Sequence, residues 1–130
     1  VFHASPGITI THQEEGPLPV LADREHMLRV LNNLIKNAVQ AMPEDHDGRI
    51  DVIARREGAR ARIEVRDNGA GIPAEARDRI FTPSFTTKSS GMGRGLAMVK
   101  RMVEQAGGRV WFESEEGKGT RFFVELPLRR

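Results

Sequence analysis

The chain has 130 residues and a mass of 14.5 kDa, which fits one compact domain and leaves no room for two. With 38% hydrophobic residues, 29% charged residues and no cysteine, it is not a disordered tail, a disulfide scaffold or a cysteine-ligated metal protein. A net charge of +2, 5% aromatic residues and the lack of an apolar run of about 18 residues argue against nucleic-acid binding and against a membrane span.

The first part of the chain predicts two short strands and a long helix. Apolar and polar side chains alternate in residues 8–12, and residues 20–22 form a second short strand after a break rich in Gly and Pro. Asp23 is placed to cap the helix that follows, in which apolar side chains recur at spacings of three and four. We expect about five turns of helix, ended by Pro43.

The second part predicts a hairpin, a short helix, a long helix and another hairpin. The arginine-rich stretch over residues 55–66 is expected to be a solvated face of the sheet. The elements are expected at residues 50–54, 61–66, 74–80, 96–106, 110–112 and 122–126. This order predicts an α+β fold, a two-layer α/β sandwich with a mixed, mostly antiparallel sheet and helices on one face. We expect residues 1–130 to be a single domain, and the start at Val1 instead of Met indicates a piece of a longer protein.

Two asparagines on the long helix are the first candidates for chemistry. Asn33 and Asn37 are four residues apart, so they share a face, and this face adjoins the apolar stripe. Asparagine is a poor helix former, and a partly buried pair needs hydrogen-bond partners. One interpretation is a pair of amides satisfied by backbone or water. The other is an amide oxygen bound to a hard cation such as Mg²⁺, which prefers oxygen ligands.

Three glycine-containing segments are further candidates. Residues 67–71 follow a strand, which is typical of a turn but also lets a flat ligand approach the backbone beside the carboxylate of Asp67. Residues 91–95 open onto a helix, where free N–H groups suit a phosphate cradle, although a lid also needs glycines. Residues 117–120 are typical of a hairpin turn. None of these segments is specific by itself.

Together, the order and spacing of these motifs resemble the ATP-binding domain shared by sensor histidine kinases, gyrase, Hsp90 and the mismatch-repair protein MutL, known as the Bergerat fold. The resemblance extends from about Val20 to Pro127. Five motifs carry it: the N box (33–38), the G1 box (67–72), the F box (81–88), the G2 box (91–96) and the G3 turn (117–120). The F box and the form of the G2 box are similar to those of histidine kinases in particular.

One side chain separates the branches of this family. In the gyrase, Hsp90 and MutL branches, a glutamate one turn before the metal-binding asparagine activates water. Asn33 stands at the matching position here, and an amide cannot act as a general base near neutral pH. The resemblance therefore implies transfer of a phosphoryl group to an external nucleophile in preference to hydrolysis. It also disfavours the related anti-sigma serine kinases, which keep this glutamate.

The sequence departs from many histidine kinases in four ways. Gln40 stands where a phosphate-binding lysine is common, and Ala41 replaces a common tyrosine. The loop over residues 88–91 is short, which implies a brief ATP lid, and Arg94 replaces a frequent leucine in the G2 box. A short lid and the Gln-Ala ending resemble the nitrogen-regulation sensor branch. Because Gln40 is neutral, Lys88 is the cation expected to offset the charge of the γ-phosphate.

At the adenine end of the site, the resemblance implies a role for each matching residue. Asp67 would accept a hydrogen bond from the adenine amine, and Gly71 and Thr120 would complete this pocket through a water. Ile72 would pack on the ring. Asp67 and Lys88 would thus serve opposite ends of the ligand.

At the phosphate end, Asn37 would bind Mg²⁺ between the phosphates, and Asn33 and Lys88 would position the group that is transferred. The N–H groups of residues 93–96 would hold phosphates at the helix N-terminus. Phosphoryl transfer needs mainly positioning and charge stabilisation, so the site needs no nucleophile of its own. The residues implied in nucleotide binding are Asn33, Asn37, Gln40, Asp67, Gly69, Gly71, Ile72, Thr87, Lys88, Gly93, Arg94, Gly95, Leu96 and Thr120.

The phosphoacceptor is expected outside this chain. A histidine kinase phosphorylates a histidine followed by Glu or Asp on a separate dimeric helical hairpin. Of the four histidines here, only His46 has an acidic neighbour, and it lies in a loop flanked by Pro and Gly. The resemblance therefore implies three things about partners: the dimerisation/phosphoacceptor hairpin of the same kinase binds directly, a response regulator acts indirectly, and this fragment is monomeric. It also implies a cytoplasmic location, alone or as the cytoplasmic part of a membrane-bound sensor.

The leading hypothesis is thus the catalytic domain of a protein-histidine kinase that uses Mg-ATP, and two alternatives stay open. The first is an ATP-driven conformational gate of the gyrase or MutL kind, which needs steady hydrolysis and is disfavoured by Asn33. The second is a nucleotide-sensing module without transfer activity, which Gln40 and Arg94 keep open because a fold does not guarantee an activity.

Overall fold

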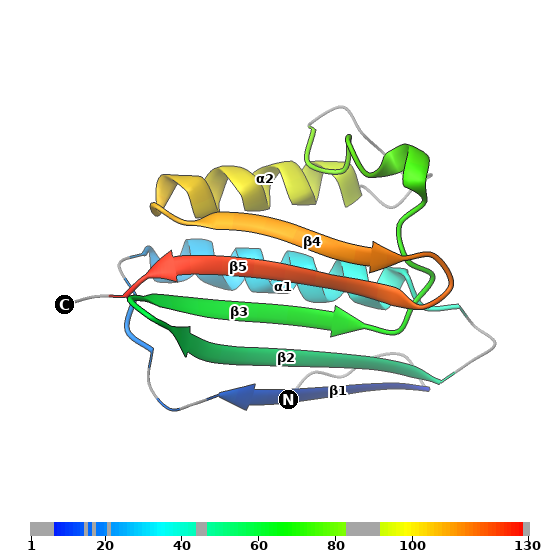
Figure 1. The fold of residues 1–130 in the computed structure, drawn as a ribbon, viewed down its shortest axis with the longest axis horizontal. Helices are drawn as coiled ribbons and strands as arrows, with labels where there is room; N and C mark the ends of the chain where they lie inside the picture. The colour runs from blue at the N-terminus through cyan, green and yellow to red at the C-terminus, as the bar shows by residue number, and fades with distance from the viewer. Residues whose placement is uncertain are drawn as a thin grey trace.

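The structure is a computed structural model that describes residues 7–14, 16, 18–20, 22–43, 47–82 and 92–128, with side chains from Gly95 onward in the last range. Within these residues, five strands form one sheet and two α-helices lie on one of its faces (Figure 1). The elements in chain order are β1 (Ile8–Glu14), α1 (Arg24–Gln40), β2 (Gly48–Glu57), β3 (Arg60–Asp67), a 3₁₀ turn (Ala74–Ala76), α2 (Met92–Gln105), β4 (Arg109–Glu115) and β5 (Gly119–Pro127).

The sheet has the strand order β1-β2-β3-β5-β4, with β1 parallel to β2 and every other pair antiparallel. Both helices cover the same face, and apolar side chains of helices and strands fill the space between the layers. The most completely buried of these side chains are Val30, Leu34, Ile50, Val65, Val99, Val103, Val124 and Leu126. This arrangement confirms the two-layer α+β sandwich with a mixed, mostly antiparallel sheet.

Helix α1 begins where the sequence predicts and ends slightly early. The carboxylate of Asp23 accepts hydrogen bonds from two N–H groups of the first turn, at 2.9 and 3.1 Å, which satisfies two donors that the helix leaves free. The helix ends at Gln40, before Pro43. The carbonyl of Ala41 accepts a hydrogen bond from the N–H of Ala70 (3.0 Å), so the end of α1 is attached to the loop after β3.

Two short elements differ from the sequence-based prediction. The strand expected at residues 20–22 is reduced to a single bridge between Val20 and Leu128, because Pro19 has no N–H with which to lengthen a ladder. The helix expected at residues 74–80 is wrong: one 3₁₀ turn is followed by further turns. The N–H groups there bond to carbonyls three residues back, at 2.9–3.4 Å, and so short a segment does not sustain an α-helix by itself.

Helix α2 begins at Met92, four residues before the predicted start at Leu96. Gly93 and Gly95 of the G2 box therefore lie in its first turn and not in a preceding loop. Glycine inside a helix costs about 1 kcal/mol relative to alanine, so packing must favour this start. A Cβ added at Gly95 would lie 2.5 Å from Oδ1 of Asn33, which shows that the glycine lets α2 approach α1 closely.

The face of the sheet that carries no helix among the described residues is turned toward the viewer in Figure 1. Glu64 and Glu125 on this face are only 3% and 4% exposed, because arginine side chains cover them. Trp111 stacks on Phe123 beside them, with ring centroids 5.1 Å apart. The ion pairs are Glu64–Arg66 (2.8 Å), Glu64–Arg121 (2.9 Å), Glu125–Arg62 (2.6 Å) and Glu125–Arg109 (3.1 Å). Part of the arginine stretch expected to face water thus also shields this face.

Candidate functional site

The candidate site lies at one end of the sheet, where several elements meet. In Figure 1 this is the right-hand end, at which β3 and α1 end, α2 begins and β4 turns into β5. The register pairs Asp67, the last residue of β3, with Thr120 near the start of β5. Both side chains face the helix layer and line a cavity there.

This cavity has a volume of about 340 Å³, which falls within the range of small-ligand sites. Its wall is mainly apolar, with a few polar side chains from α1, β3 and β5. The lining residues are Asn37, Gln40, Ala41, Asp67, Ala70, Gly71, Ile72, Pro73, Ala76, Ile80, Leu96, Thr120 and Phe122. Those that the sequence analysis names as nucleotide-binding are Asn37, Gln40, Asp67, Gly71, Ile72, Leu96 and Thr120. The fold therefore brings the N, G1, G2 and G3 motifs to one space.

Asp67 forms the charged end of the cavity and is only 7% exposed. Its Oδ1 accepts hydrogen bonds from the N–H groups of Gly69 (2.9 Å) and Thr120 (3.3 Å). No described residue donates to Oδ2. Burial raises the pKa of Asp67 above its ordinary value, and the two backbone hydrogen bonds oppose this effect only in part. A carboxylate oxygen held in this way is a strong acceptor for an N–H group of a ligand.

Asn37 provides a second polar group, at the end of α1. It is 6% exposed, and its Nδ2 has no hydrogen-bond partner among the described residues. A buried amide donor without a partner is costly, so it points to a ligand that supplies one. A phosphate oxygen would accept from Nδ2, whereas the same amide turned over would present its oxygen to Mg²⁺. The residues present therefore fit a phosphate–metal group at this position.

The chain offers little else to a metal. The described residues contain no group of three His, Asp or Glu side chains that could hold an ion. Mg²⁺ usually keeps several waters and is bound through one or two protein groups together with substrate phosphates. Asn37 is thus a suitable protein ligand only when a phosphate-bearing molecule supplies the others.

The loop at residues 68–73 is attached to its neighbours. Oδ1 of Asn68 accepts a hydrogen bond from the N–H of Arg49 near the start of β2 (2.7 Å). Nδ2 of the same side chain donates to the carbonyl of Asp47, just before β2 (3.1 Å). Gly69 packs on the end of α1 so closely that an added Cβ would lie 2.7 Å from the carbonyl oxygen of Ala41. Gly71 has φ +78°, and a Cβ there would collide with the backbone carbonyl of Glu115. These contacts fix the loop that follows Asp67.

Three of the predicted nucleotide-binding residues do not line the cavity. Asn33 donates from Nδ2 to the carbonyl of Arg29 (2.8 Å), and its Oδ1 lies against Gly95, so both residues take part in the contact between α1 and α2. Gly69 supports the cavity from behind, through its contact with Ala41. These residues act on the site through packing in this structure.

The remaining predicted residues lie where less is described. Thr87 and Lys88, with the rest of the lid segment, lie outside the described residues. Gly93 and Arg94 belong to the first turn of α2, and the Arg94 side chain lies outside the described part. Their roles stay predictions.

Several lining residues were missed by the sequence analysis. Ala76 and Ile80, both buried, close one side of the cavity from the turns after the G1 box. Phe122 comes from β5 and lies two residues after Thr120, so the period-two alternation of the strand was the signal that could have found it. For Ala76 and Ile80, the only signal in the sequence was their spacing of four residues, which does not indicate that they line a cavity.

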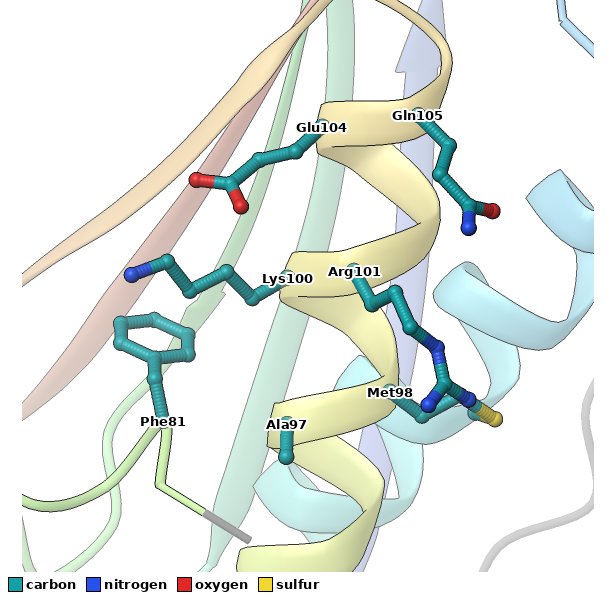
Figure 2. Close-up of a pocket in the computed structure, with 7 residues that line it drawn as sticks. All are labelled: Phe81, Ala97, Met98, Lys100, Arg101, Glu104 and Gln105. Atoms are coloured by element: carbon teal, nitrogen blue, oxygen red, sulfur yellow. The ribbon is translucent and has the colours of Figure 1, made fainter.

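A second depression, of about 580 Å³, lies along the exposed side of α2 and is shown in Figure 2. Phe81, the first residue of the F box, stands at one side, and all other lining residues come from one helix. Lys100, Arg101 and Glu104 among them project outward in Figure 2. The ring of Phe81 also packs on Phe122, with centroids 6.3 Å apart. Because this depression contains none of the predicted nucleotide-binding residues, we assign the ligand site to the smaller cavity.

This geometry agrees with a comparison to known proteins. The profile of the family described as histidine kinase-, DNA gyrase B-, and HSP90-like ATPase matches residues 22–130, and the chain belongs to this family. Within it, the chain is similar to sensor histidine kinases. It is 47% identical over 109 residues to the sensor histidine kinase ZraS of Escherichia coli strain K12, an alignment that covers 84% of this chain and 23% of that protein.

Solved structures give the same result. The catalytic domain of histidine kinase ThkA superposes with a TM-score of 0.81 at 35% identity, covering 93% of this chain and 79% of that chain. Full-length ShkA in complex with AMPPNP gives a TM-score of 0.78 at 35% identity, covering 94% of this chain and 26% of that chain. The resemblance drawn from the five motifs is thereby confirmed, whereas the nitrogen-regulation branch stays a prediction.

The chain spans about a quarter of the length of the curated relatives it matches. In the part of the chain that the structure describes, no helix is long and apolar enough to cross a membrane.

Proposed function

We propose that this domain binds Mg-ATP in the 340 Å³ cavity and donates the γ-phosphate to a histidine on a separate helical hairpin, in two-component signalling. The observation that carries the proposal is the carboxylate of Asp67. One oxygen is fixed by backbone N–H groups, and the other is available at the end of an apolar slot. This is the arrangement that a flat base with an amino group requires.

The other lining residues support an extended nucleotide. Ile72, Ile80 and Phe122 offer apolar surface for a ring next to Asp67. Asn37 lies on α1, where its unpartnered amide suits a phosphate or a metal-bound phosphate. The start of α2 contributes N–H groups and the positive end of a helix dipole, both of which favour phosphate. Mg²⁺, when bound, would neutralise phosphate charge as the γ-group leaves.

The transfer step needs a nucleophile from elsewhere. A nitrogen of the acceptor imidazole would form a bond to the γ-phosphorus while the bond from that phosphorus to the β–γ bridging oxygen breaks, which releases ADP. Among the lining residues, only Asp67 is titratable, and it lies at the base end. Asn33 is no general base. The domain would therefore position and stabilise the reacting group without attacking it.

The length of the relatives supports a partner within the same protein. Because the chain matches about a quarter of each sensor kinase, the acceptor hairpin would lie in the remainder of the same protein. A response regulator would then receive the phosphoryl group from the hairpin. We place this domain on the cytoplasmic side, whether or not the whole protein is membrane-bound.

The test uses this chain with the acceptor hairpin of its full-length protein. Calorimetry should show ADP binding by the chain alone, and labelled ATP should phosphorylate the hairpin only when the chain is present. A hairpin variant whose acceptor histidine is replaced by glutamine is the control. Nucleotide binding without any transfer would favour a sensing module, and steady phosphate release without a hairpin would favour a conformational gate.

A further inference from the structure

Ser114 lies beside the base end of the cavity without lining it. It is near the end of β4, and the register pairs it with Thr120 of β5, which is itself paired with Asp67 of β3. The three side chains therefore form one row across three neighbouring strands. Of this row, Asp67 and Thr120 reach the cavity, and Ser114 contacts Thr120 from behind.

The hydrogen bonds of Ser114 determine where the proton of Thr120 lies. A serine hydroxyl has one proton to donate and two lone pairs. Oγ of Ser114 accepts from the N–H of Ile72 (2.8 Å) and donates to the carbonyl of Gly119 (3.1 Å), since a carbonyl can only accept. Either hydroxyl could donate in the 2.9 Å contact between Ser114 and Thr120, and we assign the donor to Thr120 because the Ser114 proton then serves the carbonyl of Gly119.

Four backbone donors at this end of the cavity are also bound within the protein. The N–H groups of Gly69 and Thr120 bond to Oδ1 of Asp67, and the N–H of Ala70 bonds to the end of α1. The N–H of Ile72 bonds to Ser114. The side chains of Asp67 and Thr120 are thus left with acceptor oxygens toward the cavity. A base bound beside these two side chains must bring a donor to them.

We propose that Ser114 is a positioning residue that sets base specificity by holding the Thr120 hydroxyl as a hydrogen-bond acceptor. A threonine hydroxyl that is free to rotate could accept from a 6-amino group or donate to a 6-oxo group, and so would not distinguish them. With its proton held by Ser114, Thr120 joins Asp67 in favouring a 6-aminopurine and rejecting a 6-oxopurine. This inference rests on the proposed binding of a nucleotide base at Asp67.

The test compares ADP with inosine diphosphate, which carries a 6-oxo acceptor in place of the 6-amino donor and also a proton on N1. The measured quantity is the ratio of the two dissociation constants, IDP over ADP, by calorimetry. Ser114→Ala frees the Thr120 proton, so the ratio should fall by about three- to tenfold, the size of one neutral hydrogen bond. Ser114→Thr keeps the hydroxyl and should keep the wild-type ratio.

A double-mutant cycle shows whether Ser114 acts through Thr120. In a Thr120→Val background, Ser114→Ala should leave the ratio unchanged within twofold. Thr11→Val removes a hydroxyl that joins β1 to β2 at Asp51, and it is the matched control because neither residue lines the cavity. If Ser114→Ala does not fold, Ser114→Cys carries the same expectation, since a thiol is a weak hydrogen-bonding group.

The outcomes separate the two proposals. ADP binding with an unchanged ratio in Ser114→Ala, or an equal effect of that change with and without the Thr120 hydroxyl, overturns the role of Ser114 alone. A wild-type chain that binds neither nucleotide overturns the proposed function, and the specificity inference with it.

Discussion

At the scale of single residues, Asp67 is subject to two opposing demands. The ligand needs an ionised carboxylate, but burial raises the pKa of Asp67, which means that the folded state disfavours the charge. Because the folded chain holds a proton on this group more tightly than the unfolded chain does, ionisation at neutral pH lowers the free energy of unfolding. In the proposed function, this carboxylate serves binding at a cost in stability.

Asp67→Asn should therefore separate binding from stability. The amide oxygen can still accept from Gly69 and Thr120, but the full charge facing the cavity is lost. We expect ADP affinity to fall by about 10- to 100-fold, the equivalent of one charge-assisted hydrogen bond of about 1.5–3 kcal/mol. The ligand-free variant should be at least as stable as the wild type.

Calorimetry with ADP and thermal unfolding without ligand measure the two effects of this substitution. Asp78→Asn, on an exposed turn, is the matched control and should change neither. Equal ADP affinity for wild type and Asp67→Asn would remove Asp67 from the base-binding role. A large loss of stability in the ligand-free variant would show that the charge supports the fold.

How far the site could be predicted also depends on single residues. Asp67, Asn37 and Thr120 were found because motif order fixes them, and the structure brings them to one cavity. Ser114 and Ile80 were not predicted, because nothing in the sequence indicates which residues a serine in a strand or an isoleucine in a turn will contact. Their role depends on cross-strand register and on tertiary packing, which periodicity does not encode.

At the scale of elements, ion pairs cover part of the face of the sheet on which no described helix packs. Glu64 and Glu125 lie almost fully buried, each between two arginines. Burial raises the pKa of Glu64, but the hydrogen bonds and charges of Arg121 and Arg66 together exceed this effect and hold the pKa below its ordinary value of 4.5. The network therefore stabilises the sheet while these glutamates are ionised.

The sign of the pH dependence follows from that lowered pKa. A carboxyl whose pKa is lower in the folded state adds stability above the unfolded value of about 4.5 and loses it as the pH falls through the folded value. Glu64→Gln should therefore lower the free energy of unfolding at pH 7 by about 1–2 kcal/mol, near the lower end for charged hydrogen bonds because both arginines are partly exposed and screened. The difference should shrink as the pH falls below about 4.5.

Denaturant unfolding, followed by the fluorescence of Trp111, measures this difference at each pH, because Trp111 is the single tryptophan of the chain. Glu113→Gln is the control, since Glu113 also pairs with Arg121 (3.2 Å) but has a side chain that is 61% exposed. It should cost less than 0.5 kcal/mol, as an exposed pair does. An equal cost for both variants would mean that burial of Glu64 is irrelevant.

The contact between the G1 loop and α1 gives a second prediction at this scale. In Gly69→Ala, the new Cβ would lie 2.7 Å from the carbonyl oxygen of Ala41, so the loop or the helix end must move. We expect a loss of about 1–3 kcal/mol in stability, as for other overpacked sites, and weaker ADP binding because Asp67 and Gly71 lie two residues on either side of Gly69. Thermal unfolding and calorimetry measure both.

Gly117→Ala is the comparison for this loop variant. A Cβ added at Gly117 would have no atom within 4 Å, but the residue has φ +80°. The variant should therefore lose about 1 kcal/mol of stability through backbone strain and keep its ADP affinity. Unchanged ADP binding in Gly69→Ala would show that the loop position does not govern the site.

Periodicity predicted the elements themselves better than their ends. The alternation in β2, β3 and β5 and the spacing of three and four in α1 identified these elements, because each buries one continuous apolar face. The start of α2 was misplaced because glycines in the G2 box suggested a loop, whereas packing of Gly95 against Asn33 favours helix. Tertiary contact decided this boundary against local propensity.

At the scale of the whole molecule, the fold keeps its described histidines away from the cavity. His26 is in the first turn of α1 and Asn37 is eleven residues further along, a separation of about 16 Å at 1.5 Å per residue. His12 lies on β1, at the edge of the sheet next to β2 and not among the cavity residues. Neither of these imidazoles is therefore among the residues that line the cavity.

The isolated chain should therefore bind ATP and leave it intact. The lining residues include no base near Asn37, and Asn33 cannot activate water, so steady-state phosphate release should be close to that of a nucleotide-binding-deficient Asn37→Ala variant. Labelled ATP should leave no label on the chain itself, because no described histidine meets the phosphates. A coupled phosphate assay and autoradiography after gel electrophoresis measure these outcomes. Rapid phosphate release that Asn37→Ala abolishes would instead identify a hydrolysing site in this cavity and favour the conformational gate over the histidine kinase.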